Sequence, residues 1–189
     1  MLVGRVADSY RTILASTLGD ELTPGTEETP ARAAKAWAEL TCGYDVDIPS
    51  LFKIFEEGGY VYDQLIALTD LPFSSLCEHH LLPFSGYAHI VYLPTEHRVL
   101  GVSKFARLLD AYARRLQVQE RLTAQIADEI QEHLKPQGVM VVVEAHHLCM
   151  SCRGVRSAGV MRTSALREKL YEPTVRTEAE WLIGRSRTT

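Results

Sequence analysis

The sequence predicts an α+β protein in which an antiparallel sheet carries helices on one face and follows a helical extension. Two helical segments precede residue 43, strand-like apolar runs begin near residue 64, and one long helical segment separates two pairs of those runs. Two strands, a helix pair and two further strands are typical of a sheet with its helices gathered on one side. We therefore expect an extension over residues 1–60 and one larger domain over residues 61–189.

The extension is expected to hold two helices. Residues 1–18 carry the scattered apolar positions of the first helix, and a polar loop follows. Thr29 and Pro30 suit the start of the second, because threonine can cap a helix and proline at the first helical position gives up an N–H without a helical partner. An alanine-rich run favours this helix, which Gly43 can end. Residues 44–63 are expected to be irregular.

Four strands and a broken helix are expected in the larger domain. Val139–Val143 is a β-branched run typical of a buried strand. Residues 103–134 carry a clear apolar helical stripe that changes phase at Gln117–Gln119, so we expect the helix to break there. The four expected strands cover residues 64–71, 85–93, 138–145 and 160–166.

Composition excludes several classes of protein. The chain has 189 residues, of which 46% are hydrophobic and 23% charged, with a formal net charge of −4. These values argue against wholesale disorder and against a dedicated nucleic-acid binder. No apolar run is long enough to span a membrane and no secretory signal is recognisable, so we expect a cytoplasmic protein without nucleic-acid or membrane partners. Its four cysteines then favour free thiols or metal ligands over disulfides.

Two cysteine–histidine motifs indicate a metal site. Cys77 and His80 have C-x₂-H spacing, and Cys149 and Cys152 have C-x₂-C spacing. Thiolate and imidazole are the ligands that zinc prefers, and all four together would make a closed structural site. Three of them would leave the fourth position open for a water molecule that attacks a substrate. Spacing favours the closed site, whereas the neighbouring histidines suit proton transfer in an open one: His79, His146 and His147.

Cationic and acidic residues suggest the kind of substrate. Lys104 and Arg107 share a helix face, and Arg153 directly follows the second metal motif, which together suggest a phosphorylated substrate. Arg114 and Arg115 are better explained by a solvated helix face. Glu120, at the helix break, could be an ordinary exposed charge, or it could accept two hydrogen bonds from the amide edge of guanine.

The motifs together resemble those of the GTP cyclohydrolase I family. The similarity runs from about residue 29 to residue 167. The blocks that carry it are Thr29–Lys35, Ser75–Phe84, Gly101–Arg107, Gln117–Thr123 and His147–Val155.

The resemblance implies a fold, a reaction and an assembly. The implied fold is the tunnelling fold, an antiparallel four-stranded sheet with two helices on one face, here as the catalytic domain after the extension. The implied reaction converts GTP and water to 7,8-dihydroneopterin triphosphate and formate, the first step of pterin and folate-type biosynthesis. The implied assembly is a homodecamer with active sites at subunit interfaces.

The resemblance also implies roles for individual residues. Zn²⁺ would be held by Cys77, His80 and Cys149, and protons would be moved by His79 and His147. Glu120 with Gln119 would anchor guanine. The triphosphate and ribose contacts would come from Ser103, Lys104, Arg107 and Arg153, with Arg32 reaching in from a neighbouring subunit.

Cys152 departs from the family pattern, which usually has an apolar residue at this position. A zinc-stabilised structural assembly is the alternative if Cys152 closes the metal site. A tunnelling-fold relative that acts on another pterin or purine is a second alternative, although such relatives generally lose the zinc or guanine motifs.

Overall fold

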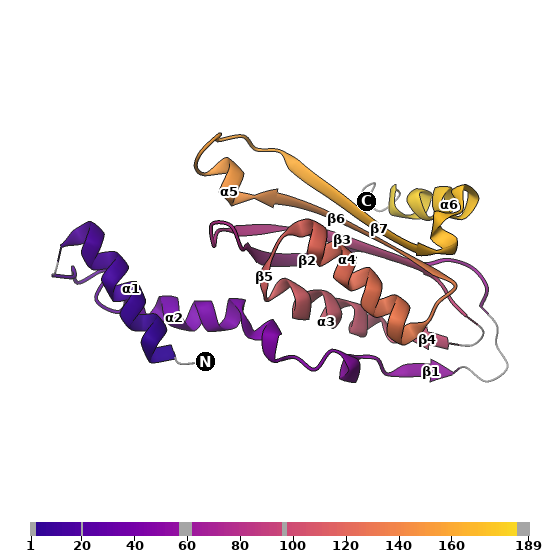
Figure 1. Ribbon diagram of the computed structural model, residues 1–189, viewed down its shortest axis with the longest axis horizontal. Coiled ribbons are helices and arrows are strands. Elements are labelled where there is room, and N and C mark those ends of the chain that lie inside the picture. The colour runs from indigo at the N-terminus through magenta and orange to yellow at the C-terminus, as the bar shows by residue number, and fades with distance from the viewer. Residues whose placement is uncertain (1–2, 20, 57–61, 96–97, 185–189) are drawn as a thin grey trace. The chain divides into compact units, whose positions relative to one another are not determined.

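The computed structural model describes residues 3–19, 21–56, 62–95 and 98–184 (Figure 1). The chain forms two compact units, Met1–Cys42 and Gly43–Thr189. Among the described helices, none is both long enough and apolar enough to cross a membrane.

The first unit is a pair of helices, α1 (Val3–Leu18) and α2 (Thr29–Leu40), that contact each other. α1 has no buried residue, whereas α2 buries Pro30 and Ala34. The expected start at Thr29 is confirmed, but the cap is not: Glu28 is the residue before the first turn and makes no side-chain cap, so Thr29 is already helical.

The second unit is built on a mixed five-stranded sheet, with the order β5-β2-β3-β6-β7. All four expected strands are present and pair antiparallel: β2 (Ile66–Cys77), β3 (Pro83–Leu93), β6 (Gly138–His147) and β7 (Val160–Glu168). A fifth strand that we did not expect, β5 (Leu116–Gln117), pairs parallel with the end of β2. The α+β class is confirmed, and the sheet is larger than the antiparallel four-stranded sheet expected.

The expected helix break is confirmed. The long helical segment consists of α3 (Val102–Ala113) and α4 (Gln119–Glu129), and α4 continues into a π-helical turn at Ile130–Leu134. Between α3 and α4 the chain leaves the helical path to form β5. The change of apolar phase in the sequence therefore marks the point where the chain joins the sheet.

Both faces of the sheet are covered, by different helices. On one face, α3 and α4 bury Phe105 and Ile126 against strand residues such as Ile90 and Val141. On the other face, α6 (Pro173–Gly184) packs with the alternate residues Val91 and Met140 (Figure 1). The cover of both faces explains why β6 is a continuous β-branched run rather than an alternating pattern.

The remaining elements are short. The segment expected to be irregular contains two 3₁₀ turns and β1 (Ile54–Glu56), which pairs with β4 (Arg98–Leu100). The turns are Cys42–Asp45 and Pro49–Leu51. The helix α5 (Leu148–Ser151) follows β6, and a 3₁₀ turn at Lys169–Tyr171 follows β7.

Candidate functional site

The metal-motif residues and the start of α4 meet at one end of the sheet. Cys77 is the last residue of β2, and His147 is the last residue of β6. Strand register places His147 opposite Phe84, at the start of β3, and Cys77 opposite Gln117 of β5. These residues come from four strands, and the start of α4 follows β5 directly at the same end (Figure 1).

A tight turn after β2 presents the first motif. The Cys77 N–H donates to the carbonyl of Leu82, and the Leu81 N–H donates back to the Cys77 carbonyl. Leu81 adopts a φ of 56°, in the left-handed region. The turn buries the Cys77 thiol and exposes His79 and His80. One buried thiol thus lies beside two imidazoles that solvent can reach.

The second motif supplies another thiol. Burial raises the pKa of the Cys149 thiol, and its hydrogen bond with the Cys77 thiol raises it further. Two adjacent thiols disfavour a thiolate, whereas a bound divalent cation reverses that preference. Cys152, one turn after Cys149, is exposed. The thiol pair is therefore a donor set that suits zinc.

The third expected ligand points elsewhere. His80 Nε2 lies 3.3 Å from Nη1 of Arg153. Across the described residues, no group of three or more His, Cys, Asp or Glu side chains is arranged to hold a metal. The structure thus brings Cys77 and Cys149 together, while the His80 ring faces a guanidinium. The chemistry of the three side chains fits zinc.

His147 is held on two sides. Its ring stacks on Phe84 with centroids 4.6 Å apart and planes 5° apart. Its Nε2 lies 2.8 Å from Oε1 of Gln119, and its Nδ1 lies 4.0 Å from the Cys149 sulfur. Burial lowers the pKa of His147, and the nearby charge of Glu120 raises it in part. A partly buried imidazole next to a thiol and a carboxylate is suited to proton transfer.

Gln119 and Glu120 have different surroundings. Gln119 is 1% exposed, and its amide nitrogen donates to the backbone carbonyls of Val143 and Met161. Glu120 is exposed in the first turn of α4. Of the two residues expected to bind guanine, only Glu120 presents its side chain to solvent.

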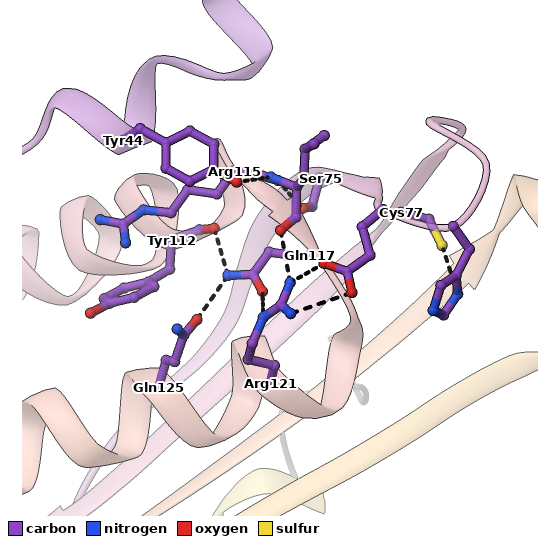
Figure 2. A network of polar contacts seen from close by, with 11 residues as sticks. Tyr44, Ser75, Cys77, Tyr112, Arg115, Gln117, Arg121 and Gln125 are labelled. Carbon is purple, nitrogen blue, oxygen red and sulfur yellow. Dashed lines mark hydrogen bonds and ion pairs between the residues drawn. The ribbon is translucent and has the colours of Figure 1, made fainter.

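An ion pair links the Cys77 turn to α4. Arg121 pairs with Glu78, and it donates to the Leu116 carbonyl and to Oε1 of Gln117 (Figure 2). Hydrogen bonding with Arg121 lowers the pKa of Glu78. Sequence reasoning did not single out this pair, because nothing in either motif indicates a partner 43 residues away. Glu78, next to Cys77, is thus tied to Arg121, next to Glu120.

Arg115 is also less exposed than we expected. It donates to the carbonyls of Gly43 and Ala111. Its guanidinium lies over the ring of Tyr112 (Figure 2). It lines a cavity of about 250 Å³ together with Tyr44 and Arg121. The expectation of a solvated helix face is wrong for Arg115, whereas the half-exposed Arg114 pairs with the exposed Asp110.

The expected phosphate-binding residues are divided. Arg153 lies beside His80, at the thiol end of the sheet. The first turn of α3 lies about 15 Å away along the helix, because α3 begins beside β4 and ends beside β5 (Figure 1). Ser103 and Lys104 belong to this first turn, and Arg107 lies near the middle of α3. Arg32 belongs to the other unit, where it pairs with Glu28.

Comparison with known proteins gives a consistent result. The model of the GTP cyclohydrolase I family matches residues 6–183. The GTP cyclohydrolase 1 of Thermoanaerobacter pseudethanolicus is 46% identical over 164 residues, which cover 86% of each chain. That of Streptomyces avermitilis is 45% identical over 182 residues, which cover 95% of this chain and 89% of the relative. Nearly the whole chain is matched, including both thiol motifs and the start of α4, and it belongs to the GTP cyclohydrolase I family of enzymes.

Proposed function

We propose that the chain converts GTP and water to 7,8-dihydroneopterin triphosphate and formate at a zinc centre, the first step of a pterin and folate-type pathway. Membership of the family supports GTP as the substrate and ring hydrolysis as the activity. The observation that carries the finer proposal is the meeting of the Cys77 and Cys149 thiols with His147 and Glu120 at one end of the sheet.

Zinc would be held by Cys77, Cys149 and His80. When bound, the metal supplies a water molecule whose pKa is lowered to about 7, which is a nucleophile at neutral pH. A site with three protein ligands keeps the fourth position for that water. The neighbouring histidines His79 and His147 suit the proton transfers of such an open site.

The chain's own residues would then bind guanine and move protons. The exposed Glu120 carboxylate has two oxygens that can accept the two adjacent N–H groups of guanine. His147 lies beside the thiols, and the charge of Glu120 acts on it. A guanine base bound at the Glu120 carboxylate would therefore be within reach of the His147 ring. His79, 3.7 Å from the Cys77 sulfur through Nδ1, would serve as a second proton carrier.

The triphosphate would be bound across a subunit boundary. Arg153 lies at the thiol end, while Ser103 and Lys104 lie in the first turn of α3, about 15 Å away along the helix, and Arg107 lies near the middle of α3. A second copy would therefore bring its Ser103 and Lys104 to a substrate held beside Arg153 of the first. This division supports a homo-oligomer with shared sites, which we propose to be a decamer of tunnelling-fold domains. Arg32, on the N-terminal helical extension, would supply a further phosphate contact from a neighbouring copy.

The proposal is tested by measuring zinc content and GTP-dependent formate release for matched cysteine variants. Cys77→Ser and Cys149→Ser should lose both zinc and formate release. Cys42→Ser is the control, because Cys42 is an exposed free thiol in the other unit and should keep both.

Two results would contradict the proposal. Full formate release from metal-free protein would exclude zinc chemistry. If Cys152→Ser lost zinc as completely as Cys77→Ser, the metal would be a closed structural site.

A further inference from the structure

The side-chain amide of Gln119 can adopt only one orientation. Its nitrogen lies 3.0 Å from the Val143 carbonyl oxygen, 3.1 Å from the Met161 carbonyl oxygen and 3.2 Å from the Thr163 hydroxyl. Carbonyl oxygens only accept hydrogen bonds, so the NH₂ end must face them. Turning the amide over would set its own oxygen against two carbonyl oxygens at a fully buried position.

This orientation decides the direction of the bond to His147. With the NH₂ group directed at β6 and β7, Oε1 faces His147 Nε2 at 2.8 Å. An amide oxygen has no hydrogen to give, so Nε2 must carry one and donate it. In the neutral ring the other nitrogen, Nδ1, is then the acceptor, on the side of the Cys149 sulfur.

Further contacts hold this arrangement rigid. The Thr163 hydroxyl is hydrogen-bonded to the Thr123 hydroxyl, which also donates to the backbone carbonyl of Gln119. Phe84 fixes the plane of the His147 ring by stacking. The direction in which the imidazole presents its free nitrogen is therefore fixed by residues of α4, β3 and β7.

We propose that Gln119 is a positioning residue that fixes the hydrogen-bonding direction of His147, rather than a residue that contacts guanine. The inference rests on the proposed function, in which His147 moves protons during the reaction on GTP. The Gln119 oxygen is occupied by His147 and its nitrogen by the sheet, which leaves the recognition of guanine to Glu120.

The chain contains a matched control, Gln117. It is also 1% exposed and lies two residues away, but its amide donates to the Tyr112 carbonyl and to Gln125. Gln119→Met and Gln117→Met each replace a buried amide by an apolar side chain of similar length, so both should lower thermal stability. Only Gln119→Met should change which ring nitrogen of His147 carries the hydrogen.

The test measures kcat and KM for GTP and records histidine ring ¹³C and ¹⁵N NMR signals of the zinc-loaded protein without GTP. A His147→Asn sample assigns the His147 signals by difference. The parent should show the hydrogen on Nε2 of His147. In Gln119→Met the hydrogen should no longer be confined to Nε2. Gln119→Met should reduce kcat by about 10²–10⁴-fold, the usual contribution of a proton-transfer group, with KM changed less than about threefold. Gln117→Met should keep kcat and the His147 signals.

Several outcomes would overturn the proposal. One is a raised KM with unchanged kcat in Gln119→Met, as expected if the amide contacts guanine. Others are equal losses of kcat in the two variants, or unchanged His147 signals in Gln119→Met. If Gln119→Met does not fold, the parent protein still decides, because hydrogen on Nδ1 rather than Nε2 of His147 contradicts the proposal. Absence of formate release from the parent would count against the proposed function instead, since the NMR signals are recorded without GTP.

Discussion

Replacing Gly86 by alanine should damage both the sheet and the site. Gly86 lies in β3 between Phe73 of β2 and Ala145 of β6. A Cβ atom there would lie 1.9 Å from the Glu144 carbonyl oxygen and 2.7 Å from the Ala145 Cα. Both are backbone atoms, so no change of side-chain rotamer can relieve the overlap. β6 would have to move away from β3.

The expected size of the effect follows from this geometry. Overpacking of a tight interior typically costs about 1–3 kcal/mol, and a clash with backbone should fall at the upper end. For a chain of this length each kcal/mol lowers Tm by about 2–4 °C, so a loss of about 3 kcal/mol predicts a fall of about 6–12 °C. The same displacement moves His147 relative to Phe84, its partner two residues from Gly86, so kcat should fall as well.

The assay combines thermal unfolding, followed by circular dichroism, with GTP-dependent formate release. Ser85→Ala is the matched control, because it creates the same side chain at the adjacent, exposed position of the same strand. Its free energy of unfolding should change by less than about 0.5 kcal/mol. A Gly86→Ala protein with the Tm and kcat of the parent would refute the argument from backbone contact.

Three further predictions concern the site. We expect the parent to prefer GTP over ATP by about 10⁴-fold, and Glu120→Gln should reduce this preference without loss of bound zinc. Comparable turnover of both nucleotides by the parent would contradict guanine recognition by this carboxylate. Arg121→Met, which removes the partner of Glu78, should weaken zinc retention against a chelator by about 10–100-fold, whereas Arg114→Met, which removes the half-exposed partner of Asp110, should not. Equal retention by the two variants would exclude a supporting role for the Arg121–Glu78 ion pair. Cys152→Met should keep zinc and formate release, and loss of zinc would identify Cys152 as a fourth ligand.

The sequence predicted those parts of the fold that have a regular apolar pattern. The break between α3 and α4 was predictable because the helical stripe changes phase there. The end of β2 was not, since we expected that strand to stop at residue 71 and it continues to Cys77. Asp70, with a φ of 56°, lies in a register shift that puts both Leu68 and Phe73 in the same core, five positions apart. Such a bulge reverses the alternation on which a strand is recognised.

The site was predictable in its residue types but not in its contacts. Spacing indicates which side chains can hold a metal, and the thiols of Cys77 and Cys149 do meet. It cannot show that His80 faces Arg153, because that contact joins residues 73 positions apart. β5 was missed for a similar reason, since a two-residue parallel pairing leaves no periodic pattern in the sequence.

The start of α4 explains why the helix break is also where the chemistry is expected. The side chains of the first three residues of α4 point in three directions. Gln119 is tied to β6 and β7 through Val143, Met161 and Thr163, while Arg121 is tied to the turn after β2 through Glu78. Glu120, between them, remains exposed. Residues one or two positions apart on a helix do not share a face, so the first turn of α4 can direct Gln119 and Arg121 to different parts of the sheet, and the break places that turn at the thiol end. Glu120 is thus held between two anchored neighbours, Arg121 on the Cys77 turn and Gln119 on His147.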